Sequence, residues 1–138
     1  MNRLYFEEIK EGYSFTTSSK PITGTEIDMV AQLSGADLPG FLDNEFAQSW
    51  GFKARVAPGA YLILSMMGLL AKQGFLANAV WVTADGISWK NPVHPGDRIH
   101  VDCEVVGTKE MKRGGGLVSY HWKIINQNQQ LVAQGTNT

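Results

Sequence analysis

The sequence lacks the residues from which several classes of protein are built. It has a single cysteine, Cys103, among 138 residues, which excludes a disulfide framework within the chain and a zinc site made of several cysteines. A lone cysteine also fits a reducing compartment. The first eight residues contain no apolar stretch of the kind that an export signal needs. We therefore expect a cytoplasmic location.

An excess of charge of one sign is also missing. Twelve basic and thirteen acidic residues give a net charge of −1 and a pI near 6.3. No overall positive field exists to attract nucleic acid or an anionic membrane, so neither is expected as a partner. A polyanionic ligand such as coenzyme A would have to be held locally, and Lys53, Arg55 and Lys90 are the cations to test.

The longest apolar run is too short to cross a membrane. It covers residues 60–71, about twelve positions, against the roughly 20 that a spanning helix needs. Pro58 suits the start of a helix, and Gly74 suits its end. Because this predicted helix is apolar on every face, we expect protein to surround it.

Shorter elements are predicted before this run. A Thr-x-x-Glu capping box followed by apolar residues at helical spacing predicts a helix over about residues 26–33. A second short helix is expected over residues 44–50, with Asp43 as its N-cap. The glycine and proline content of residues 34–41, between the two helices, predicts a loop.

From residue 78 onward the pattern changes to one of period two. Apolar and polar residues alternate over 99–105 and 118–124, which predicts half-exposed antiparallel strands. Further strands are expected over residues 14–21, 79–83, 86–90 and 131–135. An antiparallel sheet of about five strands wrapped around one long helix is an α+β fold of the hotdog type. Its uncovered sheet edge favours a dimer in which the sheet continues from one chain to the next.

Several single residues are expected to have ordinary structural positions. His94 lies next to a proline and is expected in a surface turn, whereas His100 and His121 fall on the polar faces of their strands. Their spacing is not that of a metal site, so we expect neither a metal nor a cofactor. Cys103 falls on an apolar strand face and is expected in the core. Trp89 could flank a ligand channel, although core packing explains a strand tryptophan more simply.

Segments from three parts of the chain resemble the MaoC-like family of (R)-specific enoyl-CoA hydratases and 3-hydroxyacyl dehydratases, which have the hotdog fold. They are residues 6–12, residues 34–47 with 55–59, and residues 87–97. The resemblance covers nearly the whole chain and implies a single domain over residues 1–138. Members of the family add water to acyl thioesters or remove it, which places them in fatty acid metabolism.

The loop that carries the family's acid and base differs here. Active members have the motif Asp-x-Asn-Pro-x-His, and the frame set by Pro39 places Ala36, Leu38 and Phe41 at the Asp, Asn and His positions. General acid–base groups contribute roughly 10²–10⁴-fold each, and neither alanine nor phenylalanine can transfer a proton. The candidate catalytic residue is therefore Asp37, which a shift of the loop by one residue would bring into the frame.

The start of the long helix keeps the features needed for binding. The family's His-Gly pair is Pro58-Gly59 here, and the N–H of Gly59 at the helix N-terminus could donate to a thioester carbonyl. The serine that often lines the family's pocket falls on Leu64, beside Ser65. The substrate-binding residues that this resemblance implies are Gly59, Ala60, Leu64, Met67 and Trp89.

These observations leave three functions open. The first is a protein that binds an acyl-CoA or acyl-carrier thioester without the usual Asp/His pair, as the non-catalytic subunit of a heteromeric dehydratase. The second is an active enoyl-CoA hydratase, a lyase that uses a displaced group such as Asp37. The third is a structural or regulatory hotdog homodimer without a thioester ligand. Because one fold serves several chemistries, the fold alone does not decide between them.

Overall fold

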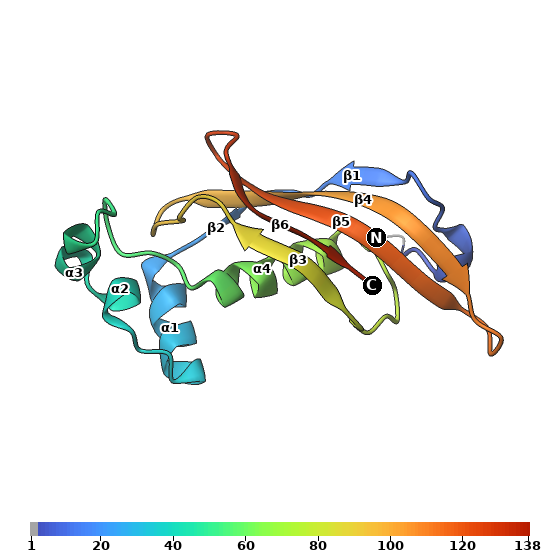
Figure 1. Ribbon diagram of the computed structural model, residues 1–138, viewed down its shortest axis with the longest axis horizontal. Helices are drawn as coiled ribbons and strands as arrows, with labels where there is room; N and C mark the ends of the chain where they lie inside the picture. Colours follow the sequence, from blue (N-terminus) through green and yellow to red (C-terminus); the bar gives the residue numbers. More distant parts are fainter. Residues whose placement is uncertain (1–2) are drawn as a thin grey trace.

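The computed structural model describes residues 3–138 and contains a six-stranded antiparallel sheet curved around one long helix, which confirms the α+β hotdog fold (Figure 1). The first two residues of the N-terminal segment, in which no export signal is expected, lie outside the described residues. The elements in chain order are the 3-10 helix η1 (Phe6–Glu8), β1 (Ser14–Thr16), β2 (Lys20–Pro21), α1 (Gly24–Ser34), α2 (Pro39–Leu42), α3 (Asn44–Ser49), α4 (Gly59–Lys72), β3 (Ala84–Trp89), β4 (Arg98–Glu110), β5 (Gly116–Asn126) and β6 (Leu131–Asn137).

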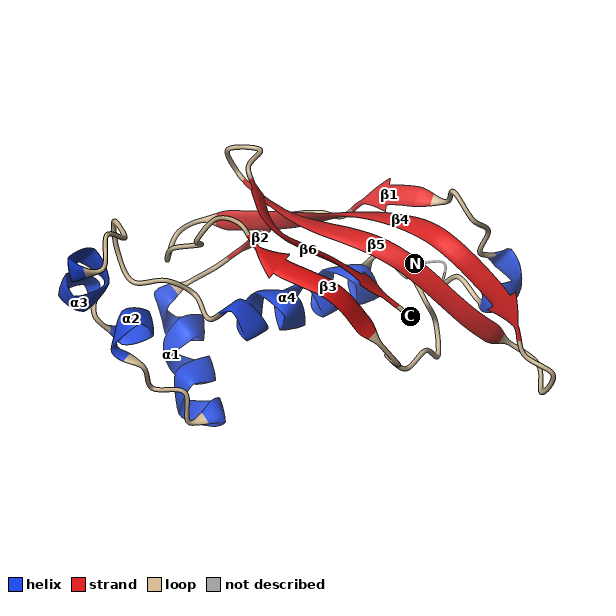
Figure 2. Cartoon of the chain, viewed as in Figure 1, coloured by secondary structure: helices blue, strands red, loops and turns tan. Residues whose placement is uncertain are grey.

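The sheet is dominated by the long hairpin of β4 and β5. Its strand order is β1-β4-β5-β6-β3, and β2 also pairs with β4 (Figure 2). Alternate residues of the hairpin face inward and are buried, among them Cys103 and Trp122, which lie opposite each other in the register. Gly135 of β6 pairs with Trp122 on the other side, and a Cβ added there would lie 2.8 Å from the indole Cζ2. Glycine is therefore needed at position 135 for the tryptophan to fit.

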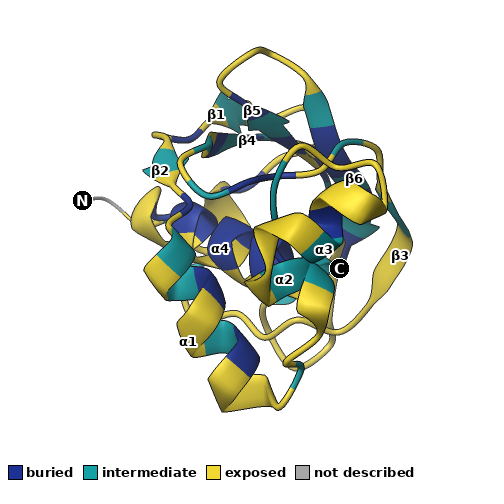
Figure 3. Ribbon diagram, turned by 90° about the vertical axis from the view of Figure 1, so that its left-hand side faces the viewer, coloured by how far each residue is buried: buried dark blue, intermediate teal, exposed yellow. Residues whose placement is uncertain are grey.

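Helix α4 packs one face against this inner surface of the sheet (Figure 3). Its buried residues are Tyr61, Leu62, Ile63, Ser65, Met66, Leu69 and Leu70. The predicted helix is thus confirmed, but the expectation that protein surrounds it is wrong for a single chain, because Leu64 is 58% exposed and Met67 40% exposed. None of the helices of the described chain is long and apolar enough to cross a membrane.

The helices before α4 follow their predicted capping signals. Thr23 and Glu26 form the capping box of α1, and Asp43 caps α3 by accepting from the backbone N–H of Glu45 at 2.8 Å. The prediction of a loop throughout residues 34–41 is wrong, because α2 begins inside it at Pro39. Proline suits the first position of a helix, where its missing N–H is not needed.

Two predicted strands differ in the structure. Residues 79–83 are not a strand. Only the end of this segment joins the sheet, where the N–H groups of Val82 and Thr83 donate to Thr138 O at 2.8 and 3.1 Å. Residues 14–21 divide into β1 and β2. Between them, Val101 N donates to the side-chain oxygen of Thr17 and not to its backbone carbonyl, so the regular strand pairing is interrupted.

Candidate functional site

The N-terminus of α4 presents unpaired backbone donors. The N–H groups of Tyr61 and Leu62 both donate to Pro58 O, at 3.0 and 3.3 Å. Those of Gly59 and Ala60 have no acceptor among the described residues, as expected for the first positions of a helix. Aligned peptide dipoles add partial positive charge here, so this end of α4 can bind a carbonyl oxygen or an anion.

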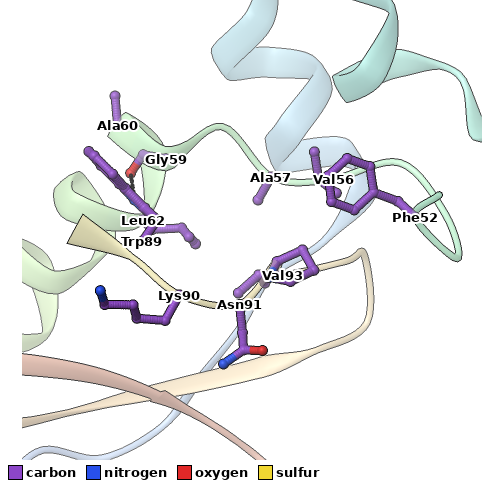
Figure 4. Close-up of a pocket in the computed structure, with 11 residues that line it drawn as sticks. Phe52, Val56, Ala57, Gly59, Ala60, Leu62, Trp89, Lys90, Asn91 and Val93 are labelled. Atoms are coloured by element: carbon purple, nitrogen blue, oxygen red, sulfur yellow. Dashed lines mark hydrogen bonds between the residues drawn. The ribbon is translucent and has the colours of Figure 1, made fainter. Parts of the chain in front are cut away.

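A pocket of about 590 Å³ opens beside these donors, and we call it the helix-start pocket (Figure 4). It is lined by Phe52, Val56, Ala57, Gly59, Ala60, Leu62, Trp89, Lys90, Asn91, Pro92 and Val93. Most of these side chains are apolar, and Lys90 is the only lining residue with a charged side chain among the described positions. The pocket can therefore hold an apolar ligand that carries one hydrogen-bond acceptor. The exposed Lys90 side chain could pair with a negative charge on such a ligand.

Trp89 covers the start of the helix. Its indole Nε1 donates to Gly59 O at 3.3 Å, and a Cβ added to Gly59 would lie 2.7 Å from the indole Cε2. Trp89 is 50% exposed, so it is not a simple core residue. Glycine at position 59 is needed for the indole to approach the helix, and the two residues together shape the helix-start pocket.

The predicted binding residues do not share one pocket. Gly59, Ala60 and Trp89 line the helix-start pocket, whereas Met67 lines a second cavity beside the C-terminal half of α4. Leu64 lines neither and lies on the exposed face of the helix. Ala60, Leu64 and Met67 nevertheless follow at helical spacing, so they form one exposed stripe that leads along α4 from the first cavity toward the second.

None of residues 34–41 lines the helix-start pocket, although the N–H of Val56, which does line it, donates to Gly40 O at 3.1 Å. Asp37 is exposed and lines neither the helix-start pocket nor the second cavity, so its catalytic role stays a prediction. Leu38 is exposed as well, whereas Phe41 is partly buried against the core. Phe41 does not close the helix-start pocket.

The side chain of Arg55 binds other residues of the chain. Its Nη1 lies 2.5 Å from Asp28 Oδ1 and also donates to Phe41 O at 3.3 Å, so it joins the loop to α1. Of the cations that the sequence offered for coenzyme A, Lys53 and Lys90 are exposed. Lys90 alone of the three lines the helix-start pocket.

The expectation that His94 lies on the surface is wrong. It is only 8% exposed, and its Nδ1 lies 3.0 Å from Arg55 O. Its backbone N–H donates to Asp97 Oδ2 at 2.8 Å. The turn between β3 and β4 packs against the segment before α4, and Ala57 N donates to Val93 O in this contact. This contact buries the histidine.

A charged cluster joins β2, α1 and α4, and the sequence analysis did not detect it. Glu26 Oε2 accepts from both Lys20 Nζ and the Tyr61 hydroxyl, and Lys20 Nζ lies 3.0 Å from the same hydroxyl. Burial alone would raise the pKa of Glu26, but the hydrogen bonds from Lys20, Tyr61 and Thr23 lower it to about 2. The signal that could have revealed it is a tyrosine within an otherwise aliphatic helix.

The comparisons with known proteins agree with this architecture. The family model described as "MaoC like domain" matches residues 7–123, and the chain belongs to this family. It is 30% identical over 109 residues to an (R)-specific enoyl-CoA hydratase of Rhodospirillum rubrum, a match that covers 79% of this chain and 74% of that protein. It is 33% identical over 99 residues to Protein MaoC of Klebsiella aerogenes, covering 72% of this chain but only 30% of that protein.

Solved structures share the fold over nearly the full length. A monoamine oxidase regulatory protein from Archaeoglobus superposes with a TM-score of 0.88 at 25% identity, covering 99% of this chain and 93% of that one. An (R)-hydratase from A. caviae superposes with a TM-score of 0.81, also at 25% identity, over 95% of this chain and 96% of that one. The HadBC dehydratase complex of Mycobacterium tuberculosis, at 18% identity and a TM-score of 0.78, shares the fold over 92% of this chain and 93% of that one.

The Lys20–Glu26–Tyr61 cluster predicts a specific loss of stability in acid. The pKa of Glu26 is lowered on folding, so its contribution is present above the unfolded value near 4.5 and is lost as the pH falls toward about 2. Glu26→Gln should cost about 1–2 kcal/mol at neutral pH, because the carboxylate is partly exposed and screened. Urea titrations at pH 7 and pH 3 should show a smaller difference from wild type at the lower pH.

The exposed Glu45, whose side chain makes no hydrogen bond among the described residues, provides the control for that measurement. Glu45→Gln should leave the free energy of unfolding unchanged within about 0.5 kcal/mol. Equal losses for the two variants, or a Glu26→Gln loss that does not depend on pH, would contradict the role assigned to the cluster.

Proposed function

We propose that this chain binds an acyl thioester, carried by coenzyme A or an acyl carrier protein, at the start of α4 without performing the usual hydration chemistry. The observation that carries the proposal is the pair of free N–H groups at Gly59 and Ala60, which lie at an apolar pocket. The family supports acyl thioesters as the ligand class, because its curated relative at 30% identity is an (R)-specific enoyl-CoA hydratase. Cytoplasmic fatty acid metabolism is the corresponding setting.

The geometry supports a defined path for the ligand. The thioester oxygen would accept from the helix N-terminus at Gly59, and the acyl chain would follow the exposed stripe through Leu64 to Met67. The eight residue steps from Gly59 to Met67 rise about 12 Å, which suits a medium-length chain. The pantetheine would leave past Trp89 and Lys90, at the solvent side of the pocket.

Catalysis requires groups that this path does not offer. Hydration of an enoyl thioester needs a base that takes a proton from water and an acid that protonates the α-carbon. Ala36 and Phe41 occupy the positions of the family's acid and base, and neither side chain titrates. The chain would therefore hold and polarise a thioester through backbone donors, while a partner chain supplies proton transfer.

We expect the isolated protein to hydrate crotonyl-CoA at no more than a small fraction of an ordinary enzyme rate. Losing acid–base groups that contribute about 10²–10⁴-fold each leaves little above the uncatalysed reaction. The measurement is the loss of enoyl absorbance with purified protein. A turnover near 10 s⁻¹, a typical value for enzymes, would contradict the proposal and favour the displaced-group alternative, which Asp37→Asn then tests directly.

Thioester binding is tested by calorimetry with a non-hydrolysable acyl-CoA analogue. Gly59→Ala should weaken binding at least tenfold, because the new Cβ would lie 2.7 Å from the Trp89 ring and drive the indole into the helix-start pocket. Gly40→Ala is the matched control, since a Cβ added there has nothing within 4 Å. Melting curves of both variants separate loss of the ligand from loss of the fold.

The outcomes distinguish the functions that the sequence leaves open. Binding to wild type and to Gly40→Ala but not to a folded Gly59→Ala supports the thioester site. No binding to wild type overturns it for the isolated chain, and leaves a site completed by a partner subunit or the structural or regulatory homodimer. A Gly59→Ala variant that melts earlier but binds as well as wild type shows that Gly59 serves packing alone.

We further propose that the working state is a dimer, either of two copies or with a second MaoC-like chain that has the intact loop. Strand β3 ends the sheet and pairs only with β6 among the described strands. Val80 and Val82, which precede β3 in the chain, are exposed, and Leu64 is exposed on α4. An uncovered edge beside exposed apolar side chains is stabilised by a second chain.

Sedimentation at micromolar concentration should give a dimer for wild type, and Leu64→Glu should shift it toward monomer by placing a charge in the interface. Lys72→Gln, at the exposed end of the same helix, controls for the change of net charge, because each substitution lowers it by one. If wild type is a monomer alone, mixing it with a MaoC-like chain that has the Asp-x-Asn-Pro-x-His loop should give a heterodimer. A monomer under both conditions contradicts the dimer.

A further inference from the structure

The second cavity, which we call the helix-end cavity, has a mainly apolar wall. Its volume is about 590 Å³, and it lies between the C-terminal half of α4, the N-terminal segment, residues 75–82 and the β4–β5 hairpin. Phe6, Met67, Leu70, Phe75 and Trp81 are among its lining residues. Within the described chain, Glu7 is the only charged residue that lines it. The cavity thus suits an uncharged chain.

One of the polar side chains in this wall is buried. Tyr120 lines the cavity from β5 and is 7% exposed, and Phe75 packs edge-on against its ring with centroids 5.2 Å apart. The Tyr120 hydroxyl accepts a hydrogen bond from Asn137 Nδ2 at 3.2 Å. Asn137 is 0% exposed, and its Oδ1 has no partner in the described part of the chain.

This buried pair has more hydrogen-bonding capacity than it uses. When Asn137 donates, the hydrogen of the Tyr120 hydroxyl has no acceptor among the side chains and backbone of residues 3–138. If the amide is turned over, the hydroxyl donates and the amide nitrogen is left without an acceptor instead. A buried polar group left unpaired costs about 1–3 kcal/mol. While Asn137 donates, a ligand oxygen that reaches the hydroxyl would accept its unpaired hydrogen.

The hydroxyl acts as a donor and not as an anion, because burial raises the pKa of Tyr120 above its ordinary value. The neighbouring Cys103 thiol is neutral for the same reason, since burial raises its pKa to about 12. A carboxylate would find no cation among the lining residues of the described chain, and Glu7 would repel it. The matching ligand group is therefore a neutral oxygen, either a carbonyl or a hydroxyl.

We propose that Tyr120, positioned by Asn137, selects chains that carry a neutral oxygen within their apolar length. This inference rests on the proposed function, in which the chain in the helix-end cavity is the acyl group of a thioester that begins at Gly59. The substrate class is then an oxo- or hydroxyacyl thioester whose additional oxygen lies far from the thioester carbon. Tyr120 is a specificity-determining residue, because it would contact the chain and not the reacting atoms.

The first experiment measures binding of decanoyl-CoA and of its oxo derivatives, in which the ketone is moved one carbon at a time toward the chain end. Tyr120→Phe removes only the hydroxyl, and at the best ketone position it should weaken binding roughly 5–10-fold, the value of one hydrogen bond. Its affinity for plain decanoyl-CoA should be unchanged. Tyr13→Phe is the matched control, because it also removes only a hydroxyl, from an exposed tyrosine that lines neither cavity.

A second variant guards against a folding defect. Tyr120→Phe leaves the buried Asn137 amide without a partner, so Tyr120→Phe combined with Asn137→Leu replaces both members of the pair by apolar groups. This double variant should bind plain decanoyl-CoA and lack the preference for the ketone. Melting curves of each variant establish that the protein is folded during the measurement.

Probes without coenzyme A separate this inference from thioester binding. Hexane and its ketones are titrated against each protein by intrinsic tryptophan fluorescence, to which Trp81 in the cavity wall contributes. A Tyr120-dependent preference for ketones without any acyl-CoA binding supports the inference and overturns the proposed thioester function. Acyl-CoA binding with equal ketone affinity for wild type and Tyr120→Phe overturns the inference alone. The absence of binding by both kinds of probe overturns both.

Discussion

The packing of α4 against the inner face of β4 and β5 is the constraint on which the rest of the molecule depends. Met66 and Trp122 are both fully buried, and the tryptophan fits only because Gly135 lies across from it. Burial of a large apolar side chain stabilises a fold by about 1.5–3 kcal/mol, so this interface accounts for much of the driving force of folding. The same contact fixes the direction of the helix, so that its N-terminus opens at one pocket and its C-terminal half at another.

Two faces of α4 serve different purposes, one for stability and the other for binding. The face with Met66 is committed to the core, whereas the stripe with Ala60, Leu64 and Met67 is open to a ligand or a second chain. Substitutions on the stripe should change binding or assembly more than folding. The N-terminal donors need no side-chain chemistry, because they are backbone groups. They do not depend on which titrating residues the loop carries.

Sequence signals correctly predicted the features that depend only on neighbouring residues. The capping box of α1, the N-cap at Asp43 and the apolar run of α4 each depend on neighbours within a few residues, and all are confirmed. Features that depend on distant packing were not predictable. His94 is buried because its turn meets the segment before α4, and Tyr61 meets Glu26 across 35 positions of sequence. The division of the binding residues between two cavities likewise depends on how the hairpin and residues 75–82 fold over the helix.

Packing and hydrogen bonds hold the loop that contains Phe41 in place. Phe41 packs partly against the core, where a histidine would require hydrogen-bond partners for its ring. Arg55 forms an ion pair with Asp28 of α1 and donates to the carbonyl of Phe41. These two contacts attach the loop to α1, and the side chain of Phe41 does not titrate. A histidine at position 41 would therefore place a polar ring against apolar neighbours, while position 36 would still have no carboxylate. Under the proposed function, proton transfer within this chain would require both positions to change, together with the packing that now holds Phe41.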